Sequence, residues 1–154
     1  MKALTVHQPW VGLILAGWKN VENRSWSTEY RGRLLIHSGA AWEKHPRLGD
    51  RRLHVHPIAG TKAISWDRPD GLVVYDVPAG LLQTRMTLGS VELYDVVEDA
   101  DRENLWAVPG MNHWLLREPL PLMEPIQASG QLRLWTAEDA RLAVHGEPIR
   151  RLIR

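Results

Sequence analysis

The apolar residues of this chain come in short segments that glycine or proline soon interrupts, and this limits the fold to short elements. Arg33–His37 is a compact apolar segment that ends near Gly39, and His113–Arg117 is a similar segment closed by Pro119 and Pro121. No segment approaches the ~20 apolar residues of a membrane span, and the N-terminus lacks the apolar stretch of a signal peptide. We therefore expect short strands in a soluble, cytoplasmic protein with no membrane partner.

Further strands are expected where extended, alternating patterns return. Lys2–Val6 predicts a short first strand, and Leu81–Val97 predicts a longer one in which Gly89 marks a bulge or a turn. Over Gln131–Trp135 leucines alternate with Arg133, which predicts a last strand.

A helix is expected directly after the first strand. Pro9 suits the first turn of a helix, because its missing N–H costs nothing there, and Gly17 is a natural end. Ala41–His45 predicts a second, short helix, and Ala137–His145 predicts a terminal one.

Between about residues 47 and 78 the periodicity fails, and prolines and glycines recur. We expect a long, variable excursion here with one short helix or strand inside it. A run of basic side chains overlaps it, most simply as a solvated loop: Lys44, His45, Arg47, Arg51, Arg52, His54 and His56. His54 and His56 could share a strand face, but no cysteine and no clear third ligand accompany them, so we expect no metal.

The chain of 154 residues is long enough for one domain with its own hydrophobic core, and it has no internal repeat or low-complexity linker. Short strands mixed with a few helices predict the α+β class. We expect a small, mixed, partly closed β-barrel of about five or six strands with flanking helices, formed by residues 1–154 as a single domain.

Composition excludes several chemistries. The chain has no cysteine, which rules out disulfides, thiolate metal sites and a cysteine nucleophile. Its formal net charge is only +1, whereas proteins that grip long duplexes usually carry a strong basic excess, so a nucleic acid is expected at one pocket. No phosphate-binding, dinucleotide or serine-hydrolase motif is present, and we expect no cofactor.

The polar segment GWKNVENR, directly after the first predicted helix, holds Lys19, Glu22 and Arg24. In an extended segment Glu22 and Arg24 share a face. A lysine held against a carboxylate can act as a base or a phosphate contact, and an arginine can clamp a phosphate or stack on a base. The plain alternative is a surface ion pair, worth at most about 1 kcal/mol.

Three separated blocks, HQPW, GWKNVENRSW and YRGRLLIH, together resemble the signature of the ASCH family. That signature has a Q-P pair opening a helix, then G-x-K-x-x-E-x-R, then R-G-x-L-x-I-H. The later segments GSVELYDV, PGMNHWLL and GQLRLW extend the resemblance over most of the chain, with residues 47–78 matching least. The resemblance implies a PUA-like barrel with an RNA-binding cleft beside the first helix.

By position, the resemblance places Lys19, Glu22 and Arg24 along that cleft. Further candidates for ligand binding are Gln8 and Pro9 at its helical wall, and Tyr30, Arg31 and His37. A cationic pair would hold phosphate, and an amide and a carboxylate would recognise base edges. His37 is equally explained as a strand histidine with a buried hydrogen bond.

The resemblance also raises an enzymatic alternative, because one bacterial branch of the family hydrolyses N4-acetylcytidine with a threonine, a lysine and a glutamate. The lysine falls on Lys19 and the glutamate on Glu92, but the threonine position is Glu22, which puts the covalent mechanism in doubt. Lys19, Glu22 and Glu92 could instead activate water. Other members have been linked to RNA cleavage.

A second candidate site surrounds the segment Trp106–Trp114. Trp106 and Trp114 could form aromatic walls, with Asn112 and His113 bonding a base edge. The plainer account is a proline-glycine turn entering a strand whose tryptophan packs the core, which we favour for Trp114.

Three functions follow from these patterns. The first is binding of RNA or a modified nucleoside through the cleft; the second is hydrolysis of a modified nucleoside or RNA, with Lys19 and Glu92 as catalytic groups. The third is a protein-interaction module.

Overall fold

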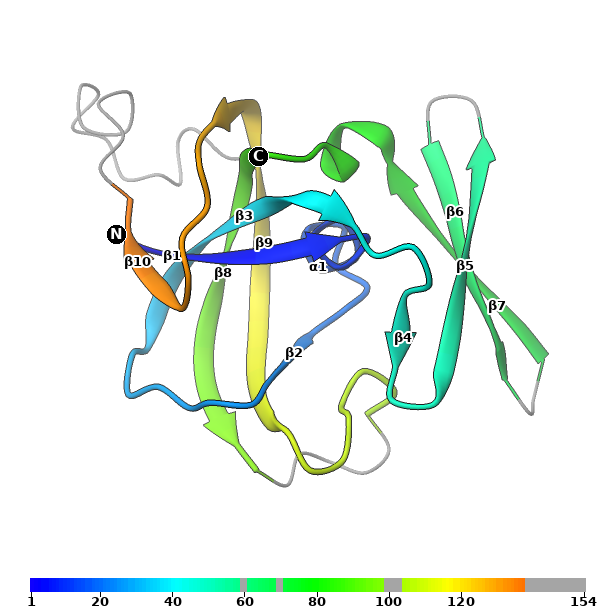
Figure 1. The fold of residues 1–154 in the computed structure, drawn as a ribbon, viewed down its shortest axis with the longest axis horizontal. Helices are drawn as coiled ribbons and strands as arrows, with labels where there is room; N and C mark the ends of the chain where they lie inside the picture. Colours follow the sequence, from blue (N-terminus) through cyan, green and yellow to red (C-terminus); the bar gives the residue numbers. More distant parts are fainter. Residues whose placement is uncertain (59–60, 69–70, 99–103, 138–154) are drawn as a thin grey trace.

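The computed structural model describes residues 1–58, 61–68, 71–98 and 104–137 (Figure 1). Its elements are, in chain order, β1 (Lys2–Gln8), α1 (Trp10–Leu15), β2 (Val21–Arg24), β3 (Gly32–Trp42), β4 (Arg47–Leu48), β5 (Arg51–Ile58), β6 (Thr61–Arg68), β7 (Gly71–Pro78), η1 (Ala79–Leu82), β8 (Met86–Val97), β9 (Asn112–Gln127) and β10 (Leu134–Thr136). The protein is therefore mostly β-sheet. No helix in the described ranges has the length and apolarity that a membrane crossing requires.

The larger sheet has six strands in the order β10-β1-β3-β8-β9-β2, and Figure 1 shows them curving past α1. Its pairs are antiparallel except for β1 with β3. The outermost strands, β10 and β2, are not paired with each other. The expected barrel is thus a curved sheet that is not closed, and its open side runs between β2 and the edge formed by β10 and the second half of β1.

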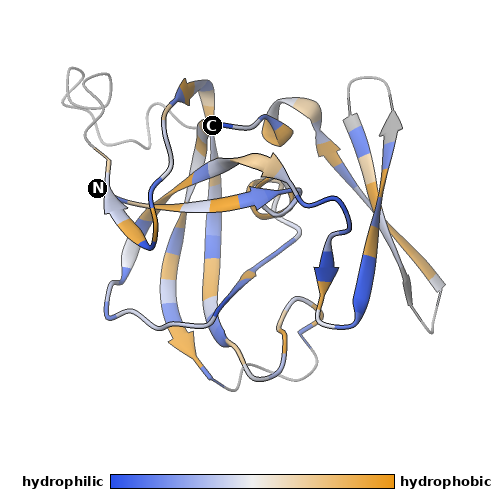
Figure 2. Cartoon of the chain, viewed as in Figure 1, coloured by the Kyte–Doolittle hydropathy of each residue, from blue (hydrophilic) through white to orange (hydrophobic). Residues whose placement is uncertain are grey.

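The interior of this sheet holds the main hydrophobic core. Buried side chains from alternate strand positions and from α1 meet there: Leu4, Val6, Leu13, Ile14, Leu34, Ile36, Val91, Leu93, Trp114 and Leu116. Figure 2 shows this alternation as changes of colour along the strands. Each large side chain moved out of water contributes about 1.5–3 kcal/mol, so the core holds α1 against the sheet.

The helix expected after Pro9 is present as α1, and all of its residues are buried. Gly17 adopts φ +89°, and the N–H groups of Gly17 and Trp18 donate to the carbonyls of Ile14 and Leu13, which ends the helix as expected. The chain then turns into β2, where the extended segment anticipated after Trp18 pairs with β9.

The prediction for residues 47–78 was wrong, because this stretch forms a regular antiparallel sheet, β4-β5-β6-β7. Its strands bury Leu53, Ile64, Trp66, Tyr75 and Val77 against the main core. Polar residues and prolines between these side chains concealed the pattern, since each strand buries only a few residues on one face.

Two other boundaries differ from expectation. Ala41–His45 is not a helix: β3 continues to Trp42, and the Glu43 N–H donates to the Gln8 carbonyl at 2.9 Å. β9 does not stop at Arg117 but runs through its prolines to Gln127, because shifts of register against β8 accommodate residues that cannot donate to the ladder.

The β8–β9 register shifts next to Gly89, as the sequence indicated for a bulge. The last strand is shorter than expected: β10 begins at Leu134, directly after Arg133, whose φ of +57° is not a strand conformation. The terminal helix predicted for Ala137–His145 lies outside the described residues except for Ala137.

Candidate functional site

A cavity of about 320 Å³ lies beside the first turn of α1, at the open side of the larger sheet. Its lining comes from β1, α1, β2, β4 and the loops near β3 and β9: Val6, His7, Trp10, Lys19, Glu22, Asn23, Arg24, Glu43, Arg47, Leu48, Gly49, Val108 and Met111. We call this the nucleoside cavity, after the ligand class that the sequence predicts. Its size is at the low end of the range for small-molecule sites, about 300–1,000 Å³.

Lys19, Glu22 and Arg24 form one ion network in the wall of this cavity. The Lys19 Nζ lies 2.9 Å from Glu22 Oε1, and it also donates to the Val21 carbonyl. Arg24 donates to Glu22 Oε2 from Nε at 3.1 Å, and its Nη2 lies 2.9 Å from the same oxygen as an ion pair. Only 2% of Lys19 and 7% of Glu22 are exposed, which excludes the surface ion pair as an explanation.

The network sets the charge of its members. Burial works to raise the pKa of Glu22, but the neighbouring Lys19 and Arg24 outweigh it and hold that pKa below its ordinary value. Burial lowers the pKa of the Lys19 ammonium, against the attraction of Glu22. Glu22 is therefore an anion between two cations, with both oxygens occupied.

Arg24 also crosses the open side of the sheet. Its Nη2 donates to the Thr5 carbonyl of β1 at 3.0 Å. The side chain is 24% exposed, so it joins the edges of β1 and β2 while one face stays accessible to a ligand.

Gln8 and Pro9 are both buried. The Gln8 side-chain amide donates to the carbonyls of Leu81 and Gln83 at 2.8 and 2.9 Å, and its oxygen accepts the Gly12 N–H at 3.0 Å. These bonds tie α1 to η1 and leave Gln8 outside the cavity lining.

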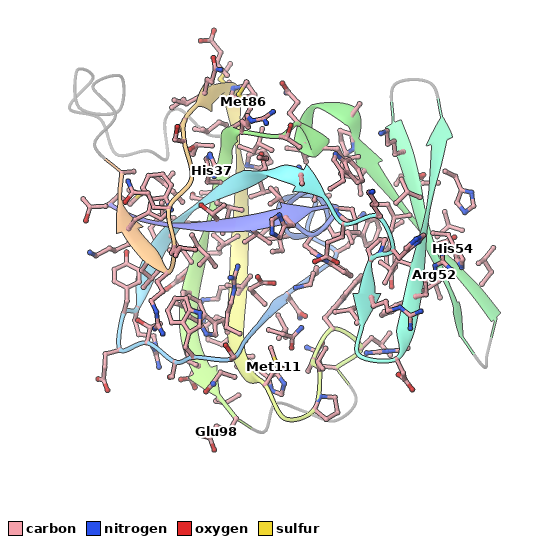
Figure 3. All side chains as sticks on the ribbon, viewed as in Figure 1. His37, Arg52, His54, Met86, Glu98 and Met111 are labelled. Carbon is pink, nitrogen blue, oxygen red and sulfur yellow. The ribbon has the colours of Figure 1, made fainter. Side chains whose placement is uncertain are left out.

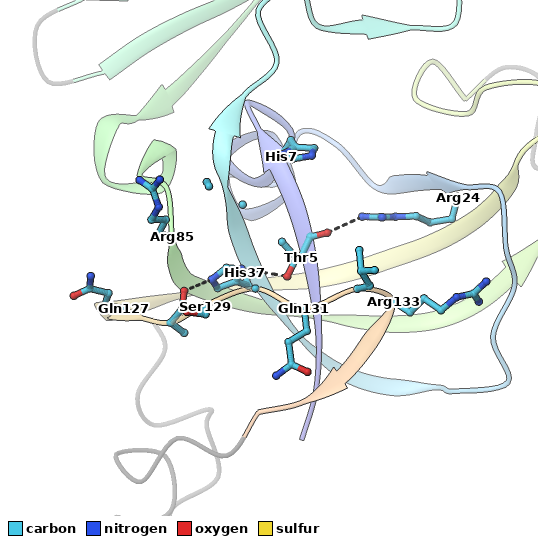
Figure 4. A pocket seen from close by; sticks show the side chains of 14 residues that line it. Thr5, His7, Arg24, His37, Arg85, Gln127, Ser129, Gln131 and Arg133 are labelled. Carbon is cyan, nitrogen blue, oxygen red and sulfur yellow. Dashed lines mark hydrogen bonds between the residues drawn. The ribbon is translucent and has the colours of Figure 1, made fainter.

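A larger cavity of about 830 Å³ lies next to the first, over β1 and the end of β3 (Figure 4). Its lining is Thr5, His7, Arg24, His37, Gly39, Ala40, Arg85, Gln127, Ala128, Ser129, Gly130, Gln131, Leu132 and Arg133. We call this the arginine cavity. His7 and Arg24 line both cavities.

His37 lies at the floor of the arginine cavity and is almost fully buried. Its Nε2 lies 2.7 Å from the Ala128 carbonyl, which can only accept, so Nε2 carries a proton. Its Nδ1 lies 3.2 Å from Thr5 Oγ1. Burial lowers the pKa of His37, although the Ala128 carbonyl works in the other direction. A neutral His37 accepting the Thr5 hydroxyl fits this geometry.

Most of the chain matches the model of one known protein family. The model of the ASCH domain matches residues 4–126. The chain belongs to the ASCH domain family.

Shorter matches point to two mammalian relatives. Activating signal cointegrator 1 of Homo sapiens is 56% identical over 43 residues, which are 28% of this chain and 7% of that protein. The same protein of Mus musculus is 54% identical over 43 residues, again 28% of this chain and 7% of the relative. The matched part is thus a small fraction of these relatives.

Glu92, Tyr30 and Arg31 are further predicted site residues of this ASCH domain that line neither cavity. Glu92 is on β8, where its carboxylate accepts Arg117 Nε at 2.8 Å. The Tyr30 hydroxyl donates to the Arg33 carbonyl, and Arg31 pairs with Asp95 at 3.4 Å. The structure therefore brings Lys19 and Glu22 together, but not Glu92 with them.

Trp106, His113 and Trp114 of the second predicted site are packed inside the ASCH domain. Trp106 stacks on Trp66, with ring centroids 4.9 Å apart, and Trp114 meets Trp26 edge-on at 4.8 Å. His113 Nε2 contacts the Val108 carbonyl at 2.6 Å. The core position favoured for Trp114 is confirmed, and Trp106 has a similar one.

Sequence reasoning missed several groups at the nucleoside cavity. His7, Glu43 and Arg47 line it, and Met111, which is labelled in Figure 3, adds an apolar side chain to the lining. His7 stands inside the HQPW block, which was the available signal. Arg47 was hidden within the basic run, and Glu43 within the expected helix.

Two histidines of the basic run have other contacts. Arg52 Nη2 lies 2.8 Å from His45 Nδ1, and His56 Nε2 lies 3.0 Å from Ser65 Oγ. In the described part of the chain, no group of three or more metal-ligating side chains gathers.

Proposed function

We propose that this ASCH domain binds RNA or a modified nucleoside in the nucleoside cavity beside α1. The observation that carries the proposal is the buried Lys19–Glu22–Arg24 network in the cavity wall. A buried charge network in a concave site commonly serves function. The association of the ASCH family with RNA binding agrees with this assignment.

The cavity offers the contacts that a nucleoside needs. Trp10, Val108 and Met111 supply apolar wall area for the faces of a base. His7, Glu43 and Arg47 supply polar groups for base edges and ribose hydroxyls. Glu22 does not face a ligand in this proposal; it positions the two cations.

The test is a binding measurement with cytidine, N4-acetylcytidine and a labelled RNA of about ten nucleotides. His7→Ala should weaken binding by about 2–10-fold, which corresponds to one neutral hydrogen bond of about 0.5–1.5 kcal/mol. His7 is exposed, so the variant should keep its stability.

The matched control is His54→Ala, because His54 is also exposed and lines neither cavity (Figure 3). Unchanged binding in His7→Ala would argue against this cavity. Failure of every nucleoside and RNA to bind would favour a protein partner instead.

A second candidate function is hydrolysis, favoured by the lowered pKa of Lys19 beside Glu22. A lysine that releases its proton more easily can serve as a general base toward water. Mass spectrometry of N4-acetylcytidine and RNA after incubation tests this, with Lys19→Met expected to abolish turnover. Glu92→Gln should retain turnover if its pairing with Arg117 is structural, and lose it if Glu92 is catalytic.

A further inference from the structure

The wall of the arginine cavity is strongly cationic in a chain whose charges nearly cancel. Among the described residues, three arginines, Arg24, Arg85 and Arg133, line it together with two histidines, and no aspartate or glutamate does. Over the whole chain, 19 lysines and arginines face 18 acidic residues. The absence of carboxylates in this lining is therefore a local feature that favours an anion.

Three arginines elsewhere on the described surface are neutralised by acids. Such pairs join Arg31 to Asp95, Arg33 to Glu118 and Arg117 to Glu92. Among the described residues, by contrast, no carboxylate pairs with Arg85 or Arg133. Arg133 lies over the Trp26 ring, with its guanidinium carbon 4.9 Å from the ring centroid.

The same two arginines have an unfavourable backbone conformation. Arg85 and Arg133 both have φ of +57°, and among the described non-glycine residues only Glu118 also has a positive φ. Glycine would adopt this conformation more readily. Strain of this kind concentrates at binding and catalytic sites, where the side chain serves a purpose that glycine cannot.

The arginine cavity is a neighbour of the nucleoside cavity, because His7 and Arg24 line both. Figure 4 shows Arg85 and Arg24 toward opposite sides of the hollow, with His37 and Thr5 between them. A ligand with several anionic groups along its length matches this spread of cations better than one compact anion.

We propose that the arginine cavity binds phosphates of a single-stranded oligonucleotide, one nucleoside of which occupies the nucleoside cavity. This inference rests on the proposed function and names its ligand class as an extended chain. Arg85 and Arg133 hold phosphate oxygens through their paired N–H groups. Gln127 and Gln131, in the same lining, supply amides for sugar hydroxyls.

The experiment measures affinity for a labelled single-stranded RNA of about ten nucleotides as a function of salt concentration. Each phosphate contact to a single strand contributes about 0.7 to the slope of log affinity against log salt. Arg85→Gln and Arg133→Gln should each lower the slope by about 0.7, and the double variant by about 1.4. Binding of uncharged cytidine or N4-acetylcytidine should not change.

Arg52→Gln is the matched control. It makes the same change of charge at an exposed position that lines neither cavity, so the slope should stay that of the wild type (Figure 3). Thermal unfolding of each variant checks that the fold is intact.

The other outcomes separate the two proposals. If the RNA binds with the same slope in the arginine variants, or if only the nucleosides bind, the arginine cavity is not a phosphate site, although the proposed function stands. If inorganic phosphate displaces the RNA as effectively as an unlabelled oligonucleotide, the cavity is a simple anion site and the inference is overturned. If neither RNA nor nucleoside binds, both proposals fail.

Discussion

Glu22 positions the cationic side chains of Lys19 and Arg24, and this role requires no contact between Glu22 and a ligand. Its two carboxylate oxygens accept from Lys19 and Arg24, while its side chain is almost fully buried. Removing one partner of a buried ion pair is much costlier than replacing the whole pair, because it leaves a buried charge without its counter-ion. The same reasoning applies to Lys19→Ala, whose effect on binding must therefore be separated from its effect on folding.

Glu22→Gln should lower the free energy of unfolding at neutral pH by about 3 kcal/mol, because it leaves Lys19 buried without its anion. The pKa of Glu22 is lower in the folded protein than its ordinary 4.5. Its contribution is therefore complete above pH 4.5 and is lost as the pH falls through the folded pKa.

Urea unfolding from pH 7 down to pH 3 checks this prediction, and the gap between wild type and variant should narrow in acid. Glu118→Gln is the control, since the Glu118 side chain is 63% exposed and its pair with Arg33 should contribute at most about 1 kcal/mol. A constant gap over the whole range would contradict the role given to Glu22.

His37 should make stability depend on pH in a second, higher window. Burial lowers its pKa from 6.5, so as the pH falls below that value the unfolded chain takes up the proton first, and stability declines toward the folded pKa. In His37→Gln, the free energy of unfolding should change less between pH 7.5 and 5 than in the wild type. If the free energy of unfolding depends on pH equally in wild type and variant, His37 is not the cause of that dependence. His54→Gln serves as the matched control.

At the scale of elements, sequence patterns identified the helix and strands that are defined by residues close to one another in the sequence. The first helix was predictable from Pro9 and Gly17, and β3 from its compact apolar run. β5, β6 and β7 were not, because their buried residues become a pattern only when the strands pair. The length of β9 depends likewise on β8, whose register shifts accommodate the prolines.

The same limit applies to the candidate site. The G-x-K-x-x-E-x-R block correctly placed Lys19, Glu22 and Arg24 together, because they are close in sequence. His7, Glu43 and Arg85 come from separate elements, and only the fold brings them to the cavities.

Gly89 should tolerate no side chain where β8 meets β9 and α1. An added Cβ would lie 2.7 Å from the Leu120 carbonyl oxygen and 2.8 Å from Leu15 Cδ2. Gly89→Ala should therefore destabilise the protein by about 1–3 kcal/mol, because backbone must move.

Gly80→Ala in η1 is the matched control. A Cβ at Gly80 would have no neighbour within 4 Å, so this variant should be neutral or slightly stabilising. Chemical denaturation of both variants makes the comparison, and equal stabilities would contradict the close approach at Gly89.

At the scale of the whole molecule, the balance of charge limits how nucleic acid can be bound. With a formal net charge of +1, affinity must come from a few placed cations. Three arginines in one cavity lining predict a salt slope of about 2 for single-stranded RNA.

A duplex of equal length should bind more weakly than the single strand, because paired bases cannot enter the nucleoside cavity. Salt titrations with both RNAs test this prediction. A slope far steeper than about 2, or equal affinity for the duplex, would indicate a broad electrostatic surface instead.

His7 and Arg24 belong to two cavity walls at once, and Arg24 is held by Glu22 on one side and Thr5 on the other. A molecule that draws Arg24 toward one cavity changes what the other cavity offers. Thermodynamic linkage then requires reciprocity: the factor by which a bound nucleoside alters affinity for a separate phosphate equals the factor by which phosphate alters affinity for the nucleoside. We therefore expect binding at the two cavities of this ASCH domain to be coupled through the side chain of Arg24.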